Sequence, residues 1–347
     1  MKKYSAQRKK LKRKMAISQK SYRKTLPFVF LFIISVGFLS VVGFYRSVSQ
    51  KWASADSTSA YPLQNRNLAS LLVAEVSMAE SKPSDIRNIQ VYLFNKTSKN
   101  TLIYEISAEN VFDIPGKYGE EKLSKVFALG SLSEDGEKEG VNLLVKSVKK
   151  ILGLNMDRYV LLESADYNNL KNLIENDSSP SILKTANSLS ADSVATNMSL
   201  ADIYELFNFS ADSKQEVSKV TVDLSDSAYA EELDSATREA TFDSVVSSEK
   251  KGVSVLNGAT MAGVANYGSR IVENISGHVL SSSNAQRQYE ESMLIVDDFS
   301  SDTAKYISEF FGVRNVVLKN QALDILENEI ARSDITLILG FDIADTL

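Results

Sequence analysis

The sequence predicts an α/β protein, with two α/β domains carried on a single N-terminal transmembrane helix. Three observations lead to this prediction. Residues 26–45 (LPFVFLFIISVGFLSVVGFY) are twenty residues without a charge. Strand-like and helix-like patterns alternate through residues 67–210, and they alternate again through residues 252–347. Such alternation is typical of strands and helices packed in layers around one core.

The uncharged segment 26–45 is long enough to cross a lipid bilayer, because a helix of this length rises about 30 Å. A buried core helix would show a polar face, and only Ser35 and Ser40 interrupt this one. A cleaved signal peptide has a shorter apolar region, although Ala53-Ser54-Ala55 resembles its cleavage site, so this alternative stays open. We expect a retained anchor whose partner is the bilayer itself.

The N-terminal tail, residues 1–25, sets the orientation. It holds eleven Lys or Arg and no acidic residue, which predicts a cytoplasmic tail and an extracytoplasmic location for everything after Arg46. Without this tail, 28 basic residues (39 − 11) stand against 44 acidic ones, a net charge of −16. The tail could be a nucleic-acid arm, but beside a spanning helix we expect it to meet anionic lipid headgroups, with no nucleic-acid partner. The predicted localisation is therefore a single-pass protein of the cell membrane.

The composition excludes several kinds of chemistry. The chain has no Cys, which excludes a disulfide framework, a thiol nucleophile and a Cys-based zinc site. It has one His, His278, which we expect to be a surface or strand residue. A lone His is not a metal cluster, so we expect no metal ligands and no cofactor.

Residues 46–66 are Ser-rich and polar without an apolar period, so we expect a linker. Within residues 67–210, the runs 89–95 and 101–107 read as strands, and the turn KTSKN between them predicts a hairpin. Farther along, apolar residues at helical spacing in 141–152 predict an amphipathic helix that ends at Gly153.

The order and spacing of four motifs over roughly residues 68–175 resemble the LytR-CpsA-Psr family. The motifs are Ile114-Pro115-Gly116, KLSKVFALG at 122–130, LGLNMDRYV at 152–160 and DYNNL at 166–170. The resemblance implies an anchored, extracytoplasmic enzyme. Such an enzyme transfers phosphate-linked glycopolymers from a lipid pyrophosphate carrier onto the cell wall, using arginines for the pyrophosphate and acidic residues at a metal and active site.

This sequence departs from the family at its arginine motifs. The first, R-x-D-T, falls on Asp85-Ile86-Arg87-Asn88, and the second has Ala108 in place of its Arg. The third, an arginine block, would fall within residues 176–200, which hold one Lys and no Arg. Guanidinium groups suit phosphate because they stay charged and bind in a bidentate way. The sequence therefore predicts a truncated, degenerate domain that has lost catalysis.

Residues 211–251 are acidic and rich in Ser and Ala, so we expect a linker, with a possible short strand at VTVDL. Residues 252–347 then resemble the LytR C-terminal domain, a smaller α/β domain. The residues that carry this resemblance are Val255-Leu256-Asn257-Gly258, Gly263, Asn284-Ala285 and Leu339-Gly340-Phe341-Asp342.

The turn after the first strand of that domain is the candidate binding site, formed by Asn257, Gly258 and Gly263. Free amides at the following helix N-terminus could hold a small ligand. The alternative is that Asn and Gly serve the turn itself. Nucleotide binding is disfavoured, because GATMAG lacks the G-x-G-x-x-G spacing.

The predicted function is that of an envelope protein without catalysis, a scaffold or binding protein whose partner is cell-wall glycopolymer or an envelope protein. The alternative is an active phosphotransferase that attaches glycopolymers from a polyprenyl pyrophosphate carrier to the wall. Transcriptional control is a third possibility, but the basic tail has no helix-turn-helix pattern.

Overall fold

A computed structural model describes the folded part of the chain. The described residues are 67–79, 82–116, 118–176, 195–198, 202–206, 208, 216–224, 229–242 and 245–344, together with four helical residues, Ser35, Phe38, Ser40 and Val42. Apart from those four, the predicted membrane segment 26–45 lies outside the described residues, as do the tail 1–25 and the linker 46–66. Within the described residues, no helix has both the length and the apolar character needed to cross a bilayer.

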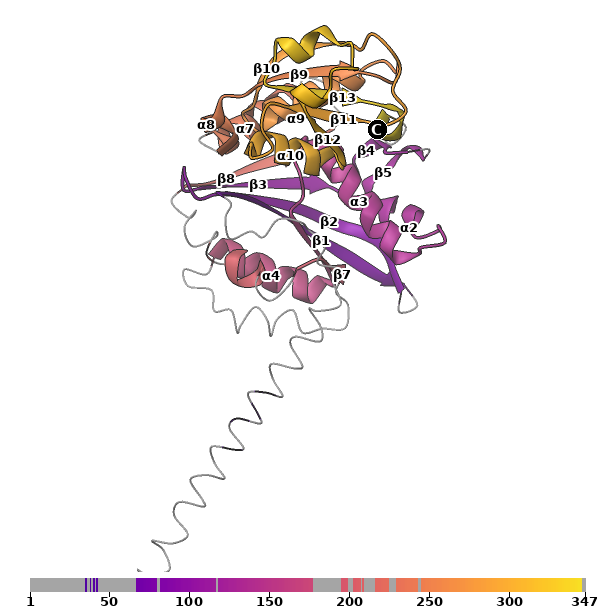
Figure 1. Ribbon diagram of the computed structural model, residues 1–347. Coiled ribbons are helices and arrows are strands. Elements are labelled where there is room, and N and C mark those ends of the chain that lie inside the picture. The colour runs from indigo at the N-terminus through magenta and orange to yellow at the C-terminus, as the bar shows by residue number, and fades with distance from the viewer. Residues whose placement is uncertain are drawn as a thin grey trace, which may run out of the picture. The chain divides into compact units, whose positions relative to one another are not determined.

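Residues 55–347 form one unit that contains two α/β layers (Figure 1). The first layer is a six-stranded sheet in the order β7-β6-β1-β2-β3-β8. Its strands are β1 (Leu68–Ala79), β2 (Lys82–Asn95), β3 (Asn100–Ser107), β6 (Arg158–Leu162), β7 (Ala195–Thr196) and β8 (Glu216–Val222). The predicted hairpin is confirmed, because β2 and β3 pair antiparallel from Asn88 opposite Ser107 to Asn95 opposite Asn100.

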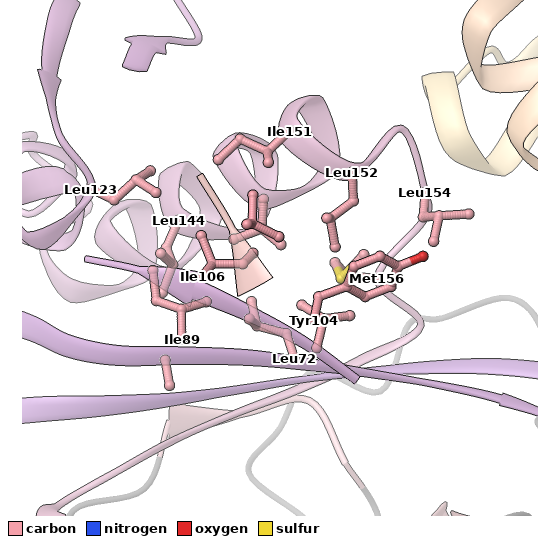
Figure 2. Close-up of a cluster of buried hydrophobic side chains, with 14 of the residues drawn as sticks. Leu72, Ile89, Tyr104, Ile106, Leu123, Leu144, Ile151, Leu152, Leu154 and Met156 are labelled. Carbon is pink, nitrogen blue, oxygen red and sulfur yellow. The ribbon is translucent and has the colours of Figure 1, made fainter. Parts of the chain in front are cut away.

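Helices cover both faces of this sheet. The helices α2 (Val126–Gly130) and α3 (Glu137–Leu152) lie over one face, and α4 (Ser164–Asn176) lies over the other (Figure 1). The core between α3 and the sheet holds Leu72, Tyr104, Leu144 and Leu152, each fully buried (Figure 2). Burial of such an apolar stripe accounts for the helix that the sequence predicted. Its end is also as predicted, because Gly153 adopts a left-handed φ of 62° and its N–H donates to the Lys149 carbonyl at 2.8 Å.

A short hairpin joins β3 to α2. Strands β4 (Val111–Ile114) and β5 (Gly119–Lys122) pair antiparallel, and a 3-10 turn, η2 (Leu123–Lys125), leads into α2. The turn lies against the end of β3, because the Ser124 N–H donates to the Ala108 carbonyl at 2.7 Å.

The second layer is a five-stranded sheet in the order β10-β9-β13-β11-β12. Its strands are β9 (Gly252–Asn257), β10 (His278–Asn284), β11 (Met293–Val296), β12 (Asn315–Leu318) and β13 (Ile335–Leu339). The helices α9 (Val264–Asn274), α10 (Asp302–Phe311) and α11 (Phe341–Ala344) accompany it. This alternation matches the α/β pattern predicted for residues 252–347. His278 is exposed at the start of β10, as expected.

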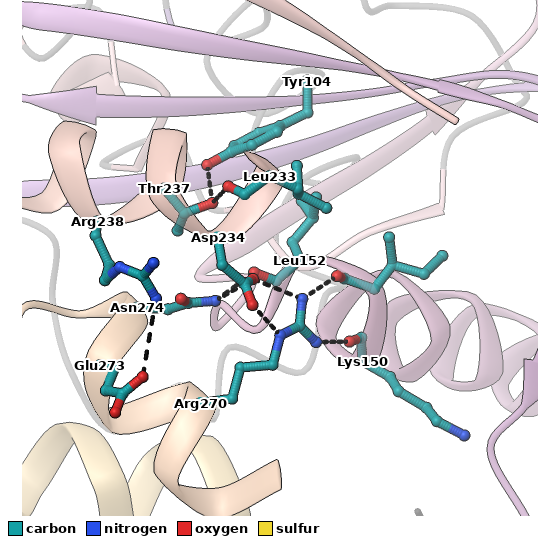
Figure 3. Close-up of polar contacts among 11 residues, drawn as sticks. Tyr104, Lys150, Leu152, Leu233, Asp234, Thr237, Arg238, Arg270, Glu273 and Asn274 are labelled. Atoms are coloured by element: carbon teal, nitrogen blue, oxygen red, sulfur yellow. Dashed lines mark hydrogen bonds and ion pairs between the residues drawn. The ribbon is translucent and has the colours of Figure 1, made fainter. Parts of the chain in front are cut away.

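Residues 211–251 differ from the expected linker. Strand β8 pairs parallel with β3, so the possible strand at VTVDL is real and longer than expected. Helix α7 (Tyr229–Thr241) buries Leu233 and Ala240 in the core of the first layer, and α8 (Val245–Glu249) follows it. The composition of α7 did not indicate a packed helix, because the segment is rich in acidic residues and its apolar stripe is short and consists largely of alanine. The described parts of this segment, β8, α7 and α8, therefore belong to the fold, and α7 supplies several of the residues in Figure 3.

Candidate functional site

The candidate site lies at one edge of the first sheet. The pairings make β1, β3, β6 and β8 parallel to one another, so their carboxyl ends meet at this edge, where β2 begins. In open α/β sheets the crevice outside the carboxyl ends of the strands is the usual ligand site. The positions of the first two family motifs, Arg87 and Ala108, lie at this edge because Asn88 pairs with Ser107. Lys122 and Lys125 reach it through η2.

Arg87 does not face an open anion site. On β1, Glu75 lies opposite Asn88, and its buried carboxylate accepts a hydrogen bond from the Asn88 side-chain amide. The Arg87 guanidinium lies 4.0 Å from the same carboxylate. The one arginine near the first motif is therefore offset by a buried negative charge.

The lysines of the neighbouring turn are paired in the same way. Lys122 Nζ lies 2.7 Å from a Glu109 carboxylate oxygen, and Lys125 Nζ lies 2.9 Å from one of Asp85. The hydrogen bond and charge of Glu109 raise the pKa of Lys122, as expected for an ammonium held by a carboxylate. All four side chains are at least partly exposed, so each pair adds little stability, but each places a negative charge beside a cation.

Ala108 is buried, and its carbonyl holds the Ser124 N–H. Its methyl side chain has no group that could bind phosphate. Arg87, Lys122 and Lys125 each face a carboxylate, and Ala108 replaces the arginine of the second motif. This edge therefore has no local excess of positive charge at these positions to hold a pyrophosphate.

A second polar group of residues lies beneath α4, on the sheet face that Glu75 and Asn88 share. Gln90 pairs with Glu105 across β2 and β3, and Gln90 Nε2 donates to Glu105 at 3.1 Å. On α4, Glu175 accepts from Tyr92 OH at 3.1 Å and lies 2.8 Å from Lys219 Nζ. Burial is the main cause that raises the pKa of Tyr92, with Glu175 adding to it, so this phenol stays neutral at physiological pH.

The sequence reasoning missed these carboxylates, Glu75, Glu105 and Glu175. They lie on three elements far apart in the chain, and strand periodicity alone did not single them out. The one available signal was an acidic residue within an otherwise apolar strand, as at Glu75.

The family resemblance also implies a divalent metal at such a site, and the residues here do not fit one. The oxygens of Glu75 are held by Asn88 and Arg87, and those of Glu175 by Tyr92 and Lys219. Over the part of the chain that the structure describes, no three His, Asp or Glu side chains gather closely enough to ligate a metal ion.

The predicted C-terminal site residues lie together at the end of β9. The Asn257 amide donates to the Met261 carbonyl at 2.7 Å, and its oxygen accepts from the Ala259 N–H at 3.1 Å. The Gly258 N–H donates to the Leu339 carbonyl at 2.7 Å, and a Cβ at Gly258 would lie 2.9 Å from the Tyr289 ring. These contacts show that Asn257 and Gly258 shape the turn.

Gly263 stands at the N-terminus of α9 with a left-handed φ of 88°, and a Cβ there would meet nothing within 4 Å. Its backbone conformation, which favours glycine, explains its place in the turn. Ligand binding at Asn257, Gly258 and Gly263 stays a prediction.

Comparisons with known proteins agree with the motifs in the first layer. Residues 84–178 match the LytR_cpsA_psr family. No curated protein matches the chain. The similar solved structures include "TagT bound to LI-WTA", with 14% identity and a TM-score of 0.38 over 54% of this chain and 95% of that one.

Two further solved structures are similar to about half of this chain. "LytR-CPS2A-psr family protein YwtF (TagT) with bound octaprenyl pyrophosphate lipid" has 15% identity and a TM-score of 0.37, covering 54% of this chain and 95% of that one. The crystal structure of B. subtilis TagV has 11% identity and a TM-score of 0.37, covering 51% of this chain and 98% of that one. The resemblance of residues 252–347 to the LytR C-terminal domain stays a prediction.

Proposed function

We propose that this chain, which carries a LytR_cpsA_psr family domain at residues 84–178, is a noncatalytic binding protein of the cell envelope. Members of this family attach glycopolymers to the cell wall. In our proposal the chain keeps the association with wall glycopolymer, or with an envelope protein, and has lost the transfer step.

The observation that carries this proposal is the pairing of cations at the sheet edge. Arg87 faces Glu75, Lys122 faces Glu109, and Lys125 faces Asp85. Phosphoryl chemistry requires positive charge where negative charge develops on the leaving group. Cations already held by carboxylates supply little of it, and Ala108 supplies none.

The location forms part of the proposal. The uncharged segment 26–45 and the eleven basic residues before it support a membrane anchor with a cytoplasmic tail. The two α/β layers would then lie outside the membrane, where wall polymer is found.

The test is retention of the full-length chain, solubilised in detergent, on purified cell wall. We expect retention on walls that carry anionic glycopolymer, or capture of one defined envelope protein from a membrane extract. Failure of both would contradict the proposal. Walls stripped of anionic polymer by mild acid are the matched control, because they keep the peptidoglycan and lose the proposed ligand.

The alternative function is an active phosphotransferase. The family match at residues 84–178 favours it, since the match includes the first two motif positions. It requires that substrate binding separate Arg87 and Lys122 from their carboxylates. Turnover of a polyprenyl pyrophosphate by the purified chain distinguishes the two functions.

A further inference from the structure

A groove of about 270 Å³ lies where the first layer meets the second, away from the sheet edge described above. One wall is the last part of α3, and the other is the end of α10 together with α9. The family resemblance assigns nothing to this groove, because its second wall lies outside residues 84–178.

The α3 wall carries three lysines, Lys146, Lys149 and Lys150. Their spacing of three and four residues places them on one side of the helix. Lys150 pairs with Asp113 at 3.0 Å, and Lys149 Nζ donates to the Phe310 carbonyl at 2.8 Å. Lys146 is exposed and makes no hydrogen bond or ion pair with any residue that the structure describes.

These lysines concentrate positive charge on an acidic protein. Residues 26–347 have a net charge of −16, from 28 basic and 44 acidic residues. Asp113 offsets the charge of Lys150, so in the described lining of the groove the ammonium groups of Lys146 and Lys149 stand against one carboxylate, Glu309. An ammonium can donate three hydrogen bonds, and the one bond from Lys149 to Phe310 leaves further N–H groups for a ligand. The groove therefore favours an anionic ligand.

The opposite wall is aromatic. Tyr267 and Phe311 meet edge to face with ring centroids 6.3 Å apart, and Phe310 meets Phe311 at 4.9 Å. Lys149 Nζ lies 4.5 Å from the Phe310 ring centroid, so the cationic and aromatic walls are in contact. A ligand that fits both walls has an anionic group next to a flat, C–H-rich face, as a sugar ring has.

We propose that this lysine–aromatic groove binds a phosphodiester of an anionic glycopolymer, with the phosphate on Lys146 and Lys149 and the adjoining sugar against Tyr267 and Phe311. The inference rests on the proposed function for the class of ligand. It adds a site in the second half of the chain, separate from the edge of the first sheet.

The test measures the affinity of the full-length chain in detergent for a short oligomer of hexose-substituted glycerol phosphate, by calorimetry. Lys146→Glu places a negative charge at the exposed end of the lysine wall and should weaken binding about tenfold. Lys138→Glu is the matched control, because it makes the same charge change on the exposed first turn of α3, where an acidic residue is favourable. It should leave the affinity unchanged.

Two further arms separate the sources of affinity. Tyr267→Leu should lower the affinity for the oligomer but not the affinity for inorganic phosphate, because it removes only the aromatic face. Soluble glycerophosphoglycerol, a membrane headgroup without its acyl chains, should bind more weakly than the oligomer. Equal binding of the two would contradict a polymer ligand. Circular dichroism melts of each variant check that it folds.

The outcomes distinguish this inference from the proposed function. If Lys146→Glu binds the oligomer as tightly as the unaltered chain, the groove is not the site, and retention on cell wall still decides the function. If the unaltered chain does not bind the oligomer, the inference is wrong whatever the wall experiment shows. Loss of affinity in Lys146→Glu and not in Lys138→Glu supports it.

Discussion

Arg270 and Asp234 form a two-point ion pair between the two halves of the protein: Nε donates to Oδ2 at 2.7 Å, and Nη2 donates to Oδ1 at 2.8 Å (Figure 3). The same guanidinium donates to the carbonyls of Lys150 at 2.9 Å and Ile151 at 2.7 Å. It thus satisfies two carbonyls in the last turn of α3 and places a positive charge at the negative end of that helix. One side chain of α9 therefore ties the second layer to both α7 and α3.

Replacing Arg270 should destabilise residues 55–347, which form one compact unit. Arg270→Ala removes the charged partner of Asp234, which keeps only the Asn274 amide as a donor, and leaves the Lys150 and Ile151 carbonyls without theirs. We expect the free energy of unfolding to fall by about 2–4 kcal/mol. Arg270→Lys keeps the charge but loses the planar fork, so its loss should be intermediate. Urea denaturation of the fragment measures both. The exposed Arg314→Ala is the control, and an Arg270→Ala midpoint equal to the control's would contradict the role of this contact.

Removing the carboxylates at the sheet edge should restore some affinity for pyrophosphate. Glu75→Gln keeps an oxygen for the Asn88 amide, while it and Glu109→Gln remove the charges that offset Arg87 and Lys122. We expect the double variant to bind inorganic pyrophosphate about threefold to tenfold more tightly than the unaltered chain. Calorimetry measures the change, and the double variant Glu134→Gln with Glu291→Gln, at two exposed positions, is the charge-matched control. Equal affinities in all three proteins would show that these carboxylates do not weaken the binding of pyrophosphate at the sheet edge.

The Lys149 ammonium should titrate well below an ordinary lysine. Burial is the main cause that lowers its pKa from 10.5 to about 8; Glu309 and Asp157 oppose the shift, and Lys146 adds to it. The unfolded chain then binds more protons than the folded one between these two pH values. This group therefore makes the free energy of unfolding rise with pH across that window.

A carbon-detected NMR titration of the lysine side chains measures that pKa directly. Lys146→Gln should raise it, because a repelling charge is removed, whereas Lys138→Gln should not change it. A Lys149 midpoint at the ordinary value of 10.5 would contradict the environment described for the groove.

The topology rests on the charge asymmetry around residues 26–45. Protease added to intact spheroplasts should digest the portion after residue 46 and leave the basic tail protected. An antibody against each end of the chain reads the result. A C-terminal half that survives in intact spheroplasts and is lost only after lysis would reverse the orientation.

Elements with a strong local period could be predicted from the sequence. The hairpin of β2 and β3 follows from two apolar strands around a polar turn, and α3 with its end at Gly153 follows from helical spacing and a left-handed glycine. In these segments the local pattern and the tertiary packing favour the same structure.

The segment from β8 to α8 could not be predicted in this way. Strand β8 has alternating polar residues and gains its place from pairing with β3, more than a hundred residues earlier. Helix α7 buries only a few apolar side chains, and its Asp234 is explained by Arg270, which lies 36 residues later. The composition of such a segment shows only that it is rich in acidic residues. Its structure depends on partners far away in the sequence, β3 and Arg270.

For the candidate site, the sequence predicted only that arginines of the family motifs are missing. The sequence shows that Ala108 stands where an arginine is expected, but it does not show which carboxylates face the remaining cations. Glu75 meets Arg87 because the register of β1 and β2 shifts at this point: Glu75 pairs with Asn88 and Val76 with Ile86, so Arg87 is an extra residue at the shift. With continuous pairing Arg87 would lie opposite Val76, on the other face of the sheet from Glu75.

The most direct test of the central claim is turnover of a polyprenyl pyrophosphate by the full-length chain. Purified protein in detergent is incubated with geranylgeranyl pyrophosphate and Mg²⁺, and released phosphate and lipid product are measured against a heat-inactivated control. Our account predicts no turnover above that control. Turnover that is present in the unaltered protein and lost in Arg87→Ala or Lys122→Ala would contradict it and establish the transferase.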